Sequence, residues 1–119
     1  MNLTAETIRD CAETTQNCLV IRAGDPRIDA AVAIRFKDRM RELTEGAGGR
    51  VVLDLGQVEF IDSSGLGAIV GAMKQLPEGV TLELAALMPN VDRVFRLTRM
   101  DTVFTIHPTA PAGQRDRAC

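Results

Sequence analysis

The residues best suited to chemistry in this chain of 119 residues lie together in one sextet, Asp62-Ser63-Ser64-Gly65-Leu66-Gly67. A serine hydroxyl can act as a nucleophile when a neighbouring base activates it. The start of a helix can also hold an anion on its free amides. The structural alternative is a helix cap, because aspartate and serine oxygens accept hydrogen bonds from first-turn amides.

Catalysis by this sextet would need a base beside Ser63 or Ser64. The chain offers one histidine, His107, and has no Gly-x-Ser-x-Gly elbow. We therefore predict a protein that is not an enzyme and interpret His107 as a strand-end residue. No cofactor is predicted, since there is no Gly-x-x-x-x-Gly-Lys phosphate loop. No metal site is predicted either, because three cysteines occur without CxxC spacing, namely Cys11, Cys18 and Cys119.

Two apolar segments flank the sextet and must position it. The segment before it is rich in β-branched residues, which predicts a buried strand and a short connection. Its apolar members are Val51, Val52, Leu53, Leu55, Val58, Phe60 and Ile61. After the sextet, apolar residues recur at helical spacing, which predicts a helix with one buried face. These residues are Leu66, Ile69, Val70, Met73 and Leu76.

The same predicted helix carries small residues beside its apolar face, namely Gly65, Gly67, Ala68, Gly71 and Ala72. A glycine inside a helix costs up to about 1 kcal/mol relative to alanine, so we expect something to approach this helix closely. The sheet, a protein partner and a phosphate are all open candidates. On the helical period Gly67, Gly71 and Lys74 form one row below Ser63. That row either meets a partner or packs internally.

The rest of the chain predicts an α/β order, β-β-α-β-α-β-α-β, in one domain over residues 1–107. Strands are expected at 3–11, 18–21, 80–84 and 103–106 in addition to the central one, with a turn at 14–17. A helix capped by Asp29 should bury Val32, Ala33, Phe36, Met40 and Leu43, and a shorter one from Pro89 should bury Val91, Val94 and Phe95. Residues 108–119 are expected to form a flexible tail.

Composition excludes several classes of function. The chain has fourteen basic and sixteen acidic residues without a run of like charge, and it has no Trp or Tyr. We therefore expect no nucleic-acid partner. No apolar stretch reaches the roughly 18 residues of a membrane span, so direct membrane insertion is not expected. The first residues lack a basic leader and an apolar core, and we predict a cytoplasmic protein.

Several of these stretches resemble the STAS domain of bacterial anti-sigma factor antagonists. The likeness covers residues 18–106 and includes RIDA at 27–30, LDLGQVEFIDSSGLGAIV at 53–70, MPNVDRVF at 88–95 and VFTI at 103–106. It implies a small mixed β-sheet of four to five strands with helices packed mainly on one face. One departure is Arg99, which stands where the third helix of the family commonly ends in glycine.

The resemblance also implies a function, which is partner switching. The unmodified antagonist would bind an anti-sigma factor that is a serine kinase, phosphorylation of Ser63 would release it, and a metal-dependent serine phosphatase would reset it. Ser64 is the second candidate for the acceptor. The expected partner-binding residues are Asp29, Asp62, Ser63, Ser64, Gly65, Leu66, Gly67, Gly71 and Lys74. The alternative is that the domain serves as a cytosolic subunit of a membrane lipid-transport ATPase.

Overall fold

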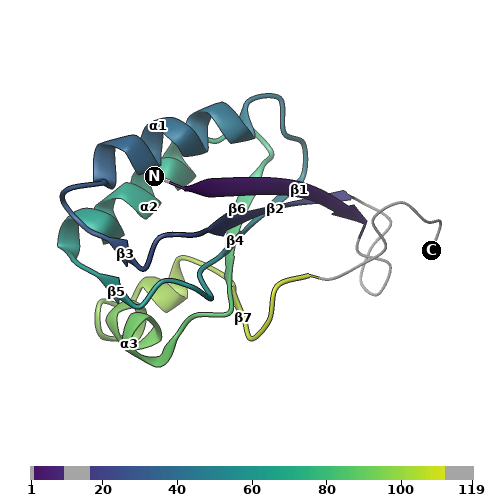
Figure 1. Cartoon of the computed structure of the whole chain (residues 1–119). Coiled ribbons are helices and arrows are strands. Elements are labelled where there is room, and N and C mark those ends of the chain that lie inside the picture. The colour runs from purple at the N-terminus through teal and green to yellow at the C-terminus, as the bar shows by residue number, and fades with distance from the viewer. Residues whose placement is uncertain (1, 10–16, 112–119) are drawn as a thin grey trace.

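A mixed five-stranded sheet carries the fold, with the strand order β1-β2-β4-β6-β7 (Figure 1). The computed structural model describes residues 2–9 and 17–111. The strands are β1 (Leu3–Arg9), β2 (Asn17–Ala23), β4 (Arg50–Asp54), β6 (Thr81–Ala85) and β7 (Ile106–His107). β1 runs antiparallel to β2, and the other neighbours are parallel, so the predicted mixed α/β sheet is confirmed.

Helices α1 (Ala33–Thr44), α2 (Ser63–Lys74) and α3 (Pro89–Leu97) each bury one apolar face in a single cluster with the sheet. Phe36 of α1, Ile69 of α2 and Phe95 of α3 are all fully buried there, beside Leu53 and Leu84 of the central strands. Helices α1 and α2 lie next to each other along the sheet (Figure 1). The helices therefore share one face of the sheet, as predicted.

The opposite face of the sheet has an apolar cluster of its own. It consists of Ile8, Cys18, Val20, Val52 and Ala85, and Ala110 packs against it. Successive residues of a strand point to opposite faces, so the central strands are apolar on both sides and read as unbroken apolar runs. The predicted tail begins at residue 108 and lies mostly outside the described residues, as do most of the turn predicted at 14–17 and residues 10 and 11 of the first strand.

A second, two-stranded sheet positions the sextet. Strands β3 (Arg27–Ile28) and β5 (Phe60–Ile61) pair in parallel, with Arg27 opposite Phe60 and Ile28 opposite Ile61. This pairing brings the segment before α1 against the segment before α2 (Figure 1). Strands of two residues have no detectable period, so the sequence did not predict it.

Two predictions about element ends were wrong. Asp29 does not cap α1, because the chain first makes a turn in which the Val32 amide donates to the Asp29 carbonyl oxygen, and the helix starts at Ala33. The last strand does not begin at Val103. A 3-10 turn, η1 (Met100–Thr102), follows α3 and delays β7 to residue 106, so Val103 is 48% exposed. Arg99 precedes that turn with φ 63°, the left-handed conformation that glycine adopts most easily.

Several predictions about burial also need correction. Phe60 is 40% exposed, because it belongs to β5 and not to the central strand. In α2 the deepest residues are Gly65, Ala68, Ile69 and Ala72, since small side chains let the helix approach its neighbours closely. The predicted stripe residues Leu66, Val70, Met73 and Leu76 are only partly buried around them. Val94 of α3 is likewise partly buried. The same holds for Val32, Ala33 and Leu43 at the first helix, where only Phe36 and Met40 of the predicted residues are fully buried.

Candidate functional site

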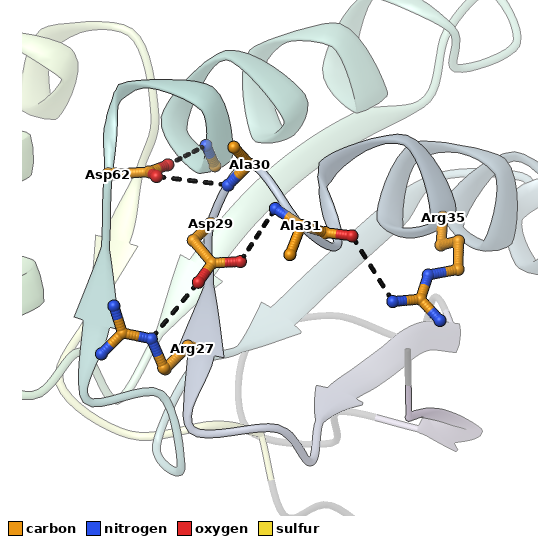
Figure 2. Close-up of polar contacts among 7 residues, drawn as sticks. Arg27, Asp29, Ala30, Ala31, Arg35 and Asp62 are labelled. Carbon is orange, nitrogen blue, oxygen red and sulfur yellow. Dashed lines mark hydrogen bonds and ion pairs between the residues drawn. The ribbon is translucent and has the colours of Figure 1, made fainter.

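The carboxylate of Asp62 holds the start of α2 in place. Its Oδ1 accepts a hydrogen bond from the Gly65 amide at 2.8 Å, which is the predicted helix cap. Its Oδ2 accepts a second bond from the Ala30 amide at 3.2 Å, so the same side chain also fastens the turn before α1 (Figure 2). The cap was predictable from the sequence, whereas the bond to Ala30 depends on the tertiary pairing of β3 with β5.

Ser63 and Ser64 follow directly and form the first two residues of α2. Both side chains are exposed. Within the described part of the chain, neither hydroxyl makes a hydrogen bond. First-turn amides have no partner inside a helix and carry its positive end, so negative charge is tolerated beside these serines. The two hydroxyls are therefore accessible groups on a rigid support.

Gly65 explains why a glycine stands in the first turn. A Cβ built on Gly65 would overlap the carbonyl oxygen of Ile28 and approach Ile61. Helix α2 thus lies directly against the β3–β5 pair, and only hydrogen fits between them. Of the candidates for close approach to this glycine, the structure identifies the protein's own backbone.

The residues of the row Gly67, Gly71 and Lys74 on α2 differ in their exposure. Gly67 is exposed with open space where a Cβ would stand, while Gly71 is partly buried beside the side chain of Lys37 from α1. Lys74, at the end of α2, is exposed. Leu66 is half-buried at the margin of the core. The row is therefore open to a partner at Gly67, nearest the serines, and at Lys74, whereas Lys37 partly covers it at Gly71.

Asp29 lies on the turn beside Asp62, and both of its carboxylate oxygens are occupied. Oδ1 accepts from the Ala31 amide at 3.1 Å, and Oδ2 lies 3.3 Å from Nε of Arg27 (Figure 2). The guanidinium of Arg27 stacks over the ring of Phe60, with 4.1 Å between its central carbon and the ring centroid. Sequence reasoning missed Arg27 and Phe60 as site residues, because their contact requires the unpredicted pairing of β3 with β5.

A different polar cluster lies across the sheet. Glu83 of β6 accepts two bonds from Arg50 of β4, at 3.0 and 3.1 Å, and lies 2.6 Å from Nε2 of His107. Burial opposes ionisation of Glu83, but the bonds to Arg50 and His107 outweigh it and hold the pKa of Glu83 below its ordinary value. Among the described residues, no hydrogen bond joins His107 to either serine, and His107 ends β7 as predicted.

The described residues contain no group of three or more His, Cys, Asp or Glu side chains arranged to hold a metal ion. Over the same residues, every helix is too short or too polar to cross a lipid bilayer. What the site presents is two accessible hydroxyls, a firmly fastened helix start and an exposed arginine.

Comparison with known proteins identifies the class. The STAS domain family model matches residues 11–112. The chain therefore belongs to the STAS domain family, as its sextet and strand order suggested. Within this fold, the close backbone contact at Gly65 and the cap at Asp62 hold the start of α2 in place.

Individual relatives narrow the comparison. An anti-sigma-B factor antagonist of Listeria monocytogenes is 32% identical over 80 residues, covering 66% of this chain and 70% of that protein. A solved Thermotoga maritima structure, described as a candidate anti-sigma factor antagonist, is 25% identical, covers 90% of this chain and 86% of its own, and superposes with a TM-score of 0.71. The unphosphorylated antagonist SpoIIAA shares the fold, at 20% identity, a TM-score of 0.64, and coverage of 88% and 87%.

Proposed function

We propose that this protein is an anti-sigma factor antagonist that works by partner switching, with Ser63 as its phosphorylated residue. The observation that carries the proposal is the exposed Ser63 hydroxyl directly after Asp62, at the capped start of α2. The Listeria relative bears the antagonist's name, and SpoIIAA is also known in a phosphorylated form. These likenesses do not favour the alternative, a subunit of a lipid-transport ATPase.

The physical basis of the switch is local charge. A phosphoryl group adds about −1.5 to −2 charges at neutral pH and three acceptor oxygens. The free first-turn amides of α2 make that charge tolerable to this fold. A partner surface that packs closely over Ser63 and Gly67 would have to desolvate the charge, so binding should weaken without any refolding of the domain.

The partners follow from this scheme. The unmodified protein binds an anti-sigma factor that is a serine kinase, and the kinase transfers the γ-phosphoryl group of ATP to the Ser63 oxygen, with loss of its proton. A metal-dependent serine phosphatase hydrolyses the phosphoserine and restores the binding form. We place these events in the cytoplasm. The centre of the contact consists of Asp62, Ser63, Ser64, Leu66 and Gly67, which the buried Gly65 holds against β3, and Asp29, Gly71 and Lys74 lie around it.

The test uses the kinase captured by the unmodified full-length protein from its native cell extract and then purified. With ATP, the wild-type protein should be phosphorylated at Ser63, as mapped by mass spectrometry. Ser63→Ala should stay bound to the kinase in the presence of ATP, whereas Ser63→Glu should bind at least tenfold more weakly.

Ser64→Ala is the matched control, because it removes a neighbouring hydroxyl and leaves the acceptor. It should be phosphorylated and released like the wild type. Phosphate found on Ser64 alone would move the acceptor to that residue. Stable co-purification with a transport ATPase and no kinase would instead support the alternative function.

A further inference from the structure

Arg27 is fixed by two contacts of its own fold. Its Nε lies 3.3 Å from Oδ2 of Asp29 (Figure 2). The central carbon of its guanidinium lies over the ring of Phe60, 4.1 Å from the centroid. The β3–β5 register places the two residues opposite each other, so the stacking follows from the backbone pairing. An arginine held in this way has little conformational freedom left to lose when it binds something else.

The rest of the guanidinium faces solvent. The Arg27 side chain is 58% exposed, and among the described residues only its Nε is paired. Its two terminal nitrogens therefore carry unused donors in the fixed fork that matches a carboxylate. Phe60 is exposed beside them, although its sequence pattern predicted burial. An exposed aromatic residue next to an ordered arginine has the composition of an interface hot spot.

The charges at this edge also indicate the chemistry of the partner. The carboxylates of Asp29 and Asp62 already accept bonds from backbone amides and Arg27. The terminal nitrogens of Arg27 remain open as charged donors, beside the exposed hydroxyls of Ser63 and Ser64 and the exposed Glu59. A donor fork of this kind calls for an acidic group. Phe60 lies three residues before Ser63 on the same segment, so the fork keeps a fixed position relative to the serine.

We propose that Arg27, stacked on Phe60, is a docking site for an aspartate or glutamate side chain of the kinase that modifies Ser63. This inference rests on the proposed function and adds a second contact point to it. Arg27 lies away from the hydroxyl and acts in recognition, outside the chemical step. It helps the kinase to select this substrate and sets the register in which Ser63 enters the kinase active site.

The first experiment measures the dissociation constant of the purified kinase for full-length variants by calorimetry without ATP. Arg27→Gln should weaken binding at least tenfold. Arg27→Lys should lose most of the same affinity, because a lysine cannot keep the Asp29 bond, the stacking and the fork together. Arg41→Gln is the matched control. It removes the same charge from an exposed position in the last turn of α1, at the opposite end from the site, and should change binding less than twofold.

Phosphorylation kinetics separate docking from chemistry. For Arg27→Gln the KM for the protein substrate should rise at least tenfold with kcat within twofold, because the contact is made away from the reacting atoms. Phe60→Leu keeps an apolar side chain but removes the stacking, and should give a smaller rise in KM. Thermal melting of each variant checks that the fold is intact, and a folded variant of either residue is sufficient for the test.

A double-mutant cycle identifies the acidic group. Each exposed Asp and Glu of the kinase is changed to Ala, and the affinity of each kinase variant is measured for the wild-type protein and for Arg27→Gln. At least one residue should show a loss of affinity that is absent when Arg27 is already Gln. If the wild-type protein binds the kinase and is phosphorylated at Ser63, and Arg27→Gln behaves in the same way, the docking site is overturned and the proposed function stands. Absence of both from the wild-type protein would remove the proposed function itself.

Discussion

Two polar clusters in this domain use the same residue types in opposite ways. In the sheet cluster, Glu83 is enclosed by Arg50 and His107, and the side chains of Glu83 and Arg50 are each only 15% exposed. In the cluster before α2, Asp29 and Asp62 bind backbone amides, and Arg27 is left largely exposed. The first cluster joins side chains of three strands, β4, β6 and β7, whereas the second fastens loops and a helix start.

The difference separates stability from recognition. Both carboxylate oxygens of Glu83 are bound within the fold, so this cluster serves to hold β7 against the central strands. The cluster before α2 satisfies its acids internally and leaves donors and hydroxyls facing outward. Exposed charges contribute little to stability, so Arg27 can serve the proposed docking without cost to the fold. Mutations in the sheet cluster should therefore lower the free energy of unfolding, whereas mutations in the cluster before α2 should weaken kinase binding.

The largest effect is expected at Gly65, which holds α2 against the β3–β5 pair. Gly65→Ala would push a methyl group into the Ile28 carbonyl oxygen, a backbone atom that cannot move aside cheaply. We expect the free energy of unfolding to fall by about 3 kcal/mol or more, together with loss of kinase binding. Urea unfolding followed by circular dichroism measures the first and calorimetry the second.

Gly67→Ala is the control, because a Cβ at that position meets open space. Alanine favours a helix over glycine by about 1 kcal/mol, so this variant should be slightly more stable than the parent. Equal stability of the Gly65→Ala and Gly67→Ala proteins would contradict the close packing of α2 on β3.

A middle-sized effect is expected in the sheet cluster. Glu83→Gln removes the charge that Arg50 and His107 share, and should cost about 1–3 kcal/mol at neutral pH. Because burial raises the pKa of Glu83 less than its two partners lower it, the folded-state pKa lies below the unfolded one. This stabilisation is therefore complete above the ordinary glutamate pKa and is lost as the pH falls through the lowered value.

The measurement is a series of thermal melts from neutral to acid pH for the parent and the variant. The difference in Tm should narrow as the pH falls below the ordinary glutamate pKa. Glu59→Gln makes the same chemical change at an exposed position and should leave the Tm nearly unaltered. Kinase binding should survive in both folded variants, and its loss in Glu83→Gln alone would mean that the two clusters are not separate in function.

The sequence predicted the parts that depend on local pattern. Central strand β4 follows from its β-branched run, α3 starts at Pro89, and Asp62 caps α2. The order of strands and helices follows from the alternation of apolar runs and helical spacing, whereas the packing of the helices on one face of the sheet was implied by the resemblance to the STAS domain.

The rest depends on pairings between distant segments. Strands β3 and β5 are too short to show a period, so neither the exposure of Phe60 nor its contact with Arg27 was foreseen. Sequence spacing does not tell which neighbour each glycine of α2 meets. In the structure Gly65 meets backbone, Gly67 meets open space and Gly71 meets a lysine.

The smallest effect is expected at Gly71, which tests how far the recognition surface extends along α2. A Cβ at Gly71 would lie 3.0 Å from Cε of Lys37, and the far end of a lysine side chain can move away. We expect Gly71→Gln to change the free energy of unfolding by less than about 1 kcal/mol, since better helix propensity offsets the displacement. If the kinase contacts this turn, binding should fall at least tenfold, which corresponds to about 1.4 kcal/mol. Calorimetry measures the affinity of the folded variant for the kinase. Lys37→Ala is the control, because it removes the side chain that Gly71→Gln would displace. Unchanged binding would confine the contact to the first turns of α2, and unfolding of the variant would show that Lys37 packs rigidly between the two helices.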